Sequence, residues 1–163
     1  MVIPVGLNTR DMFVQHSVHI ASPIETVTAV FTRDPHTWLR HLVDGRTEVG
    51  PRVAGVAIQK KVVIEVGPPL ASGSWTEVPI TWAATFIKRL FPVMTGKVEL
   101  APVDARVTRL TVCGMYQPPL GRLGKQFDDA LMHRVAEATV KELAESIAER
   151  LGAECSDGLA GVD

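Results

Sequence analysis

Asp129 and His133, two titratable residues four positions apart, are the residues of this sequence best placed to do chemistry. An acid four residues before a histidine lies beside it on a helix, in the orientation that favours attraction. On a helical wheel both residues fall within the apolar stripe rather than among the charged residues opposite. Because a charged group withdrawn from water must be paired, we expect them to contact each other, a water-filled cavity or a ligand.

This pair has one structural and two functional interpretations, and all three stay open from the sequence. The structural interpretation is a locally satisfied pair at the wet rim of the protein. The first functional interpretation is a polar anchor for a ligand hydroxyl or carbonyl. The second is a general acid/base couple, because histidine titrates near neutral pH. The candidates for catalysis are Asp129, His133 and Tyr116.

Three further side chains with polar atoms occupy strand positions that face the same interior. His16 alternates with Val14 and Val18, so its imidazole would meet a cavity rather than bulk water. Tyr116 and Trp82 would offer a hydroxyl, an indole N–H and ring surface to a flat apolar ligand. The ordinary alternative for each is a satisfied core residue.

The expected ligand-binding residues are the inward-facing ones. Strand alternation and helical spacing identify them, and a slip of one residue would turn a strand's side chains to the other face. They are His16, Val18, Ile58, Trp82, Leu110, Val112, Tyr116, Asp129 and His133.

One long amphipathic helix, predicted from about Arg122 to Leu151, would hold Asp129 and His133. At ~1.5 Å per residue it spans roughly 45 Å, enough to lie across a broad sheet. Residues 152–163 show no periodicity and are predicted to form a flexible C-terminal tail. The apolar stripe of the helix consists of Met132, Ala136, Val140, Leu143, Ile147 and Leu151.

Ahead of this helix, the chain alternates as strands do, with turn residues between the segments. Strands joined by short loops favour an antiparallel meander, because parallel neighbours need long crossovers. We therefore expect an α+β protein in which a curved sheet wraps around the C-terminal helix, residues 1–151 forming a single domain. The predicted strands are 13–20, 49 or 53 to 66, 75–87, 94–100 and 106–116, and two short helices, from Pro23 to Phe31 and from Pro35 to Leu42, follow the first strand.

Composition excludes several classes of function. The chain has 163 residues, 46% of them hydrophobic, and a net charge of -1, so it has no positive surplus to hold nucleic acid. We see no signal segment and no apolar run long enough to cross a membrane, and expect a cytoplasmic protein without integral membrane association. The two cysteines, Cys113 and Cys155, are interpreted as free thiols. No metal or cofactor is expected.

Several short motifs accompany this order of elements: Val18 to Pro23, Asp34-Pro35 followed by Trp38, and Tyr116 to Gly121 before the long helix. Together they resemble the START-like, or polyketide cyclase/dehydrase and lipid-transport (SRPBCC), superfamily. The double proline and residues 134–139 resemble a bacterial branch of it that is uncharacterised. The resemblance implies the helix-grip fold and a pocket for lipids, hormones, polyketides or quinones. Because some members cyclise or dehydrate their ligand, it implies no single reaction.

Three functions remain in view. The first is binding of a small hydrophobic ligand, such as a lipid or polyketide, between the sheet and the C-terminal helix. The second is a polyketide aromatase/cyclase or dehydratase, in which Asp129 and His133 shuttle a proton and Tyr116 stabilises an enolate. The third is a protein-interaction module with an exposed apolar patch. The expected partner is a small hydrophobic molecule and not nucleic acid, and a homodimer stays open.

Overall fold

The computed structural model of the chain describes residues 11–35, 37–38, 52–53, 56–57, 62–84, 93–117 and 129–159. The elements in chain order are β1 (Met12–Ile20), α1 (Ile24–Arg33), β2 (Arg52–Val53), β3 (Val56–Ala57), β4 (Val62–Val66), β5 (Leu70–Ser72), β6 (Trp75–Ala84), β7 (Met94–Asp104), β8 (Val107–Tyr116) and α3 (Asp129–Leu159).

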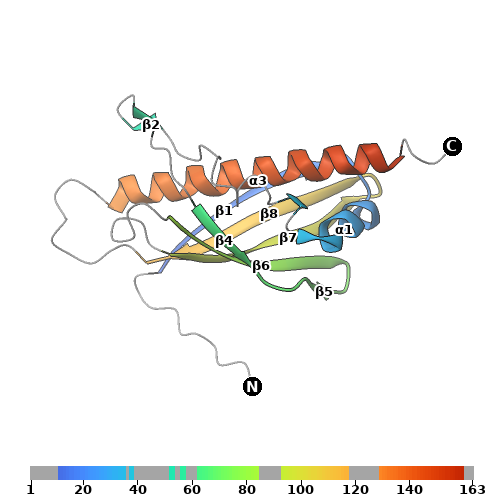
Figure 1. Ribbon diagram of the computed structural model, residues 1–163, viewed down its shortest axis with the longest axis horizontal. Coiled ribbons are helices and arrows are strands. Elements are labelled where there is room, and N and C mark those ends of the chain that lie inside the picture. Colours follow the sequence, from blue (N-terminus) through green and yellow to red (C-terminus); the bar gives the residue numbers. More distant parts are fainter. Residues whose placement is uncertain are drawn as a thin grey trace, which may run out of the picture.

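Within these residues the main sheet is antiparallel and has the order β1-β8-β7-β6-β4, with β5 paired to β6, while β2 and β3 form a separate small ladder. Figure 1 shows α3 lying across one face of this sheet and α1 beside its C-terminal half. α3 runs along β1 and β8, and α1 packs against α3, β7 and β8. The predicted α+β class and helix-grip arrangement are confirmed.

Strand alternation decides which side chains face α3, and β1 shows it clearly. Val14 and Ile20 are buried, His16 and Val18 are half-buried, and the residues between them are exposed. Side chains at every second position of a strand point to the same face, so the predicted set of inward-facing residues of β1 is confirmed.

Several strand boundaries differ from the prediction. The single strand expected to end at Val66 is divided, because β2 and β3 pair with each other before β4 begins. β6 is described as far as Ala84, and the predicted strand residues 85–87 lie outside the described residues. β7 extends past Leu100 to Asp104, with a register shift between Pro102 and Asp104. A shift of this kind accommodates a proline that cannot donate to the ladder. The hairpin then closes tightly, because Asp104 Oδ1 accepts a hydrogen bond from the Arg106 amide at 2.7 Å.

The long helix ends later than predicted. α3 continues to Leu159, so the expected end at Leu151 is wrong and residues 152–159 are helical. The cause is burial: Cys155, one turn beyond the fully buried Leu151, is 1% exposed and continues the apolar stripe. That burial outweighs the low helix propensity of Gly152, about 1 kcal/mol below alanine. The predicted start at Arg122 lies outside the described residues.

The core beneath α3 and α1 is apolar. Phe31 and Trp38 stack with ring centroids 4.7 Å apart, and the Trp38 indole donates a hydrogen bond to the Phe31 carbonyl oxygen at 3.0 Å. Both are buried, as expected of residues that anchor the short helices. In the described part of the chain, no helix has both the length and the apolar character needed to cross a membrane.

Candidate functional site

One row of side chains runs across the sheet at the end where β8 finishes. Tyr116 on β8 pairs with Met12 on β1 and Met94 on β7; Met94 pairs with Trp82 on β6, and Trp82 with Ile64 on β4. Residues directly opposite each other on neighbouring strands share a face, so all five point toward the α3 side. Tyr116 is 2% exposed and Trp82 is 4% exposed. The pairing thus brings two residues predicted from the sequence into one row.

The neighbouring row contains two glycines side by side, Gly96 on β7 and Gly114 on β8. A Cβ at Gly114 would lie 2.6 Å from Cη2 and 3.2 Å from Cζ2 of Trp82. A Cβ at Gly96 would lie 1.9 Å from the Cys113 carbonyl oxygen. The absence of side chains there lets β7 and β8 approach closely and lets the Trp82 ring lie over the middle of the sheet.

The indole N–H of Trp82 has no hydrogen-bond acceptor among the described residues, although the nitrogen is fully buried. Nε1 lies two bonds from Cζ2, so this donor also sits close to the Gly114 region of the sheet. Buried tryptophan N–H groups usually find a partner, and leaving one unsatisfied costs about 1–3 kcal/mol. Trp38 shows the ordinary outcome, because its indole donates to a carbonyl oxygen. An acceptor on a bound molecule would satisfy Trp82.

A chain of polar contacts connects the row to the rim of α3. The Tyr116 hydroxyl lies 3.4 Å from His133 Nδ1, and His133 Nε2 lies 3.4 Å from Glu137 Oε1. The exposed fraction of these side chains increases from one contact to the next: Tyr116 is buried, His133 is 34% exposed and Glu137 is 59% exposed. This arrangement can hold the orientation of the imidazole and transfer a proton between Tyr116 and His133.

Glu137 is a partner of His133 that the sequence does not indicate. The sequence places Glu137 on the charged side of the helix and points to Asp129 as the partner of His133. Asp129 is the first residue of α3, but its side chain lies outside the described part, so that pairing stays a prediction. The available signal was spacing, since Glu137 follows His133 by four residues just as Asp129 precedes it by four.

The other predicted ligand-binding residues lie farther along the sheet. His16 on β1 pairs with Val112 on β8, and Val18 pairs with Leu110. Leu110 and Val112 are fully buried within the apolar core, while His16 and Val18 are half-buried beside it. Ile58 lies outside the described residues. Their contact with a ligand stays a prediction.

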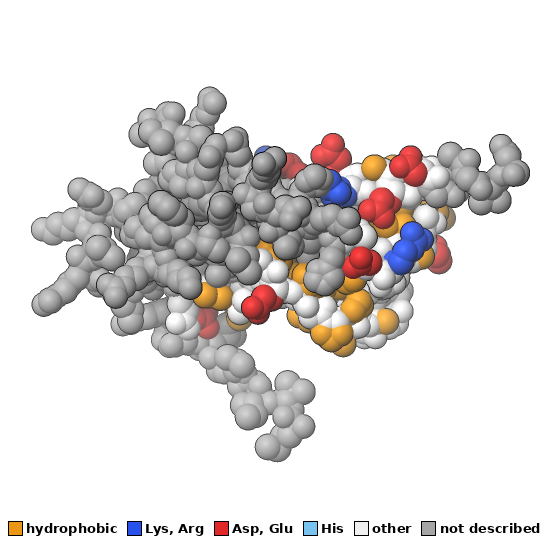
Figure 2. Space-filling view, in the orientation of Figure 1, with side chains coloured by type: hydrophobic (Ala, Val, Ile, Leu, Met, Phe, Trp, Pro, Cys, Tyr) orange, Lys and Arg blue, Asp and Glu red, His pale blue; other side chains and the backbone are white. Residues whose placement is uncertain are grey.

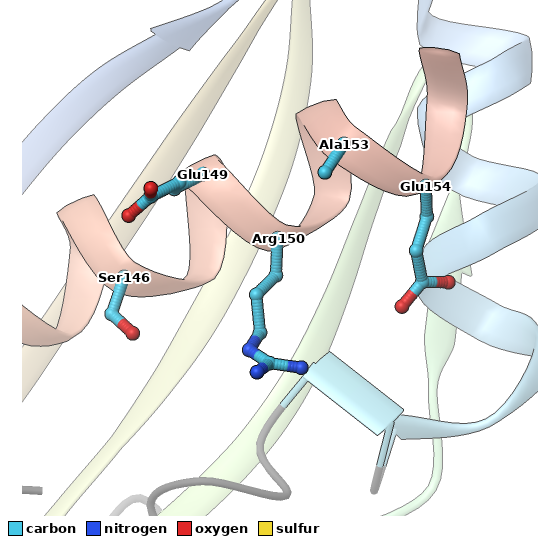
Figure 3. Close-up of a pocket in the computed structure, with 5 residues that line it drawn as sticks. All are labelled: Ser146, Glu149, Arg150, Ala153 and Glu154. Carbon is cyan, nitrogen blue, oxygen red and sulfur yellow. The ribbon is translucent and has the colours of Figure 1, made fainter. Parts of the chain in front are cut away.

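A hollow of about 450 Å³ lies on α3 itself, away from the row. In Figure 3, Arg150 and Glu154 extend from one side of the helix, and Figure 2 shows charged side chains over this half of α3. The polar and charged lining of this hollow differs from the apolar lining that was predicted for a cavity between the sheet and the helix. The lining residues are Ser146, Glu149, Arg150, Ala153 and Glu154.

The two thiols are not activated as nucleophiles. Burial raises the pKa of Cys113, which lies on the outer face of the sheet opposite Lys97. Burial also raises the pKa of Cys155. Because the thiolate is the reactive form, both cysteines are poor nucleophiles in the folded protein.

No protein-family model and no curated relative matches this chain. Solved structures do. A conserved protein from Geobacillus kaustophilus has a TM-score of 0.55 and 15% identity, covering 88% of this chain and 97% of its own. The Zhui aromatase/cyclase from Streptomyces sp. R1128 has a TM-score of 0.50 and 14% identity, covering 94% and 99%. Norcoclaurine synthase from Thalictrum flavum, in complex with dopamine and hydroxybenzaldehyde, has a TM-score of 0.50 and 9% identity, covering 100% and 98%. The chain therefore shares its fold, a long helix lying across an antiparallel sheet, with these proteins.

Proposed function

We propose that the protein binds a small hydrophobic molecule between the inner face of the sheet and α3. The observation that carries this proposal is the buried Trp82 N–H without an acceptor among the described residues. Trp82 lies on the apolar face of the sheet, and Met94 stands between it and Tyr116 in the same row. The Tyr116 hydroxyl in turn lies 3.4 Å from His133 Nδ1. Apolar walls with a few polar groups are the usual composition of small-molecule sites.

The chemistry of the ligand follows from the donor. An indole N–H only donates, so the ligand must present an acceptor, and a carbonyl oxygen is the simplest one on an apolar molecule. Two structural neighbours support an aromatic frame: one is an aromatase/cyclase and another was solved with dopamine and hydroxybenzaldehyde. A polyketide, or a lipid with a carbonyl group, would meet this requirement.

Nitrogen-15 NMR of the indole groups tests the proposal. The chain contains three tryptophans, so three indole N–H signals are expected, and Trp82→Phe identifies the one from Trp82. The probes are acetylnaphthalene and ethylnaphthalene, which have similar shapes but differ in the carbonyl oxygen. We expect the ketone to move the Trp82 signal downfield. The Trp38 signal should stay in place, because the Trp38 N–H already donates to the Phe31 carbonyl oxygen. A Trp82 signal unmoved at saturating ketone would refute the proposed role of this donor.

Native mass spectrometry of the protein purified from its own host would identify the physiological ligand. A stoichiometric hydrophobic adduct carrying a carbonyl group would support the proposal. Residence in the cytoplasm and a homodimer stay predictions, and the same spectrum reports the oligomeric state.

A second candidate function is an enzyme of the aromatase/cyclase or dehydratase kind, and the contact between Tyr116 and His133 favours it. Trp82 would polarise the ligand carbonyl. The Tyr116 oxygen would take a proton from the adjacent carbon as its own proton passes to His133 Nδ1. Deuterium exchange at that carbon of acetylnaphthalene, followed by proton NMR, tests this step. Exchange that Tyr116→Phe leaves unchanged would exclude Tyr116 as the proton acceptor.

A further inference from the structure

Arg150 and Glu154, which line the hollow on α3, carry opposite charges but form no ion pair with each other. They stand four residues apart, with the cation first. Lys141 and Glu145 have the same spacing and order, and their charged atoms lie 3.9 Å apart. Lys141 and Glu145 are more than half exposed, whereas Arg150 and Glu154 are half-buried, where an unpaired charge costs more. Spacing alone therefore does not explain why this pair is missing.

A third polar group continues this line by one helical turn. Ser146 precedes Arg150 by four residues, and Figure 3 shows Ser146, Arg150 and Glu154 extending from the same side of the helix. A serine within a helix often donates to the carbonyl oxygen four residues back, as Ser156 does to that of Gly152 at 2.9 Å. Within the described part of the chain, Ser146 makes no hydrogen bond of this kind. The hollow thus presents a hydroxyl, a guanidinium and a carboxylate, in that order, to whatever enters it.

The size and charge of the hollow limit what it can hold. Its volume of about 450 Å³ is typical of small-molecule sites. Glu149 also lines it, so one arginine is accompanied by two glutamates. A purely anionic ligand would be repelled by Glu149 and Glu154, and a purely cationic one by Arg150. A molecule that carries both charges, each next to its opposite, avoids both repulsions.

The order of the three groups indicates how such a molecule would lie. A guanidinium binds carboxylates well because its N–H groups match both oxygens, and a serine hydroxyl can donate to the same group. An ammonium group only donates, so it suits a carboxylate such as that of Glu154. Residues four apart on a helix are separated by about 6 Å along its axis. The two charges of the ligand should therefore be about one helical turn apart.

We propose that the hollow on α3 binds a small aliphatic zwitterion, with its carboxylate on Arg150 and Ser146 and its ammonium group on Glu154. Glu149 adds negative charge on the ammonium side. Arg150 follows His133 by about 25 Å along the helix, so this site is separate from the one proposed between the sheet and α3. The proposal does not rest on the proposed function.

Three compounds with the same chain of three methylene units between their ends, or its uncharged equivalent, test the proposal: γ-aminobutyrate, butyrate and butylammonium. Butyrate lacks the ammonium group, and butylammonium lacks the carboxylate. Nitrogen-15 NMR titration at neutral pH follows the Arg150 side-chain N–H and the backbone amides of residues 146–154. We expect γ-aminobutyrate to bind at least roughly threefold more tightly than either single-charge compound, because each contact with a partly exposed charge contributes modestly. The absence of a saturable shift with γ-aminobutyrate, or equal affinity for a single-charge compound, would overturn the proposal.

Two substitutions assign the ends of the ligand. Arg150→Gln should abolish the preference for γ-aminobutyrate over butylammonium, and Glu154→Gln should weaken its preference over butyrate. Arg134→Gln is the matched control for the first, since Arg134 is exposed on the same helix and does not line the hollow. Glu145→Gln is the control for the second, since Glu145 pairs with Lys141 instead. Unchanged preferences in Arg150→Gln and Glu154→Gln, or equal losses in the controls, would contradict the assignment.

Two further measurements keep these results interpretable. Neither Arg150→Gln nor Glu154→Gln breaks an ion pair among the described residues, so both variants should give the far-ultraviolet circular dichroism of the wild type. The Trp82 indole signal should stay in place when γ-aminobutyrate is added. Movement of that signal, with residues 146–154 unaffected, would place the zwitterion on the inner face of the sheet and refute the site on α3.

Discussion

Replacing either Trp38 or Trp82 by phenylalanine removes the same atoms from the core but should have different effects on stability. Both tryptophans are buried. Trp38 donates its N–H to the Phe31 carbonyl oxygen, while the Trp82 N–H has no acceptor among the described residues. The loss of ring volume is common to both changes, so the comparison isolates the hydrogen bond.

The magnitude follows from what each substitution leaves behind. Trp38→Phe leaves a buried carbonyl without its donor, at a cost of about 1–3 kcal/mol in addition to the lost packing. Trp82→Phe removes a buried unsatisfied donor and so recovers part of its packing loss. We expect Trp38→Phe to lower the free energy of unfolding by at least about 2 kcal/mol more than Trp82→Phe does.

Urea unfolding followed by far-ultraviolet circular dichroism measures both values without relying on the substituted chromophores. The ligand-free protein must be used, because a bound acceptor would satisfy Trp82 and raise the cost of its replacement. Equal costs for the two substitutions would show that the Trp82 donor is satisfied in the free protein. That result would remove the observation on which the proposed function rests.

Three further predictions concern other parts of the fold. Gly96→Ala should lower the free energy of unfolding in urea by about 2–4 kcal/mol, because its Cβ would collide with a backbone oxygen. Gly152→Ala should instead raise it by about 0.5–1 kcal/mol, because Gly152 is in a helix and its Cβ would lie 4.0 Å from the nearest atom. Equal effects would contradict the close approach of β7 and β8. Alkylation of Cys113 should be slow until urea unfolds the protein, because burial raises its pKa; equal rates in both states would contradict this. The hydrogen bond that Lys97 donates to the Glu77 carboxylate raises the pKa of Lys97 above 10.5, so the stability that this bond contributes is present below pH 10.5 and is lost as pH rises through the raised value. Glu77→Gln should reduce that loss, by no more than about 1 kcal/mol because Lys97 is partly exposed, and an unchanged pH dependence would exclude the pair as its source.

The sequence predicted the inward face of the strands because alternation depends only on local pattern. His16, Tyr116 and Trp82 were placed on the α3 side in this way, and the structure places them there. Alternation does not reveal which residues stand opposite each other, since register depends on partner strands. That Tyr116, Met94 and Trp82 stand in one row could therefore be learned only from the structure.

Two other features were not determined by the local pattern. Asp129 and Glu137 are equally spaced from His133, so the pattern alone does not choose between them, and the structure shows the contact with Glu137 while the contact with Asp129 stays a prediction. The end of α3 was misjudged because Gly152 disfavours a helix locally, while the burial of Cys155 against the rest of the fold favours it. The end of the helix is therefore decided by contacts between residues far apart in the chain.

The two ends of the inner face differ in their polar groups, and this difference supports the proposed binding site. Toward the β7–β8 hairpin, α1 and α3 both cover the sheet, and the side chains Leu100, Leu110, Ile147 and Leu151 are fully buried and apolar. The buried Thr108 hydroxyl at this end already donates a hydrogen bond to the Ser22 carbonyl oxygen at 2.8 Å. At the opposite end the sheet carries the glycine pair, the Trp82 donor and the Tyr116–His133 contact. Because unsatisfied or unusually placed polar groups cost stability, their concentration at one end argues that selection retained them there for binding.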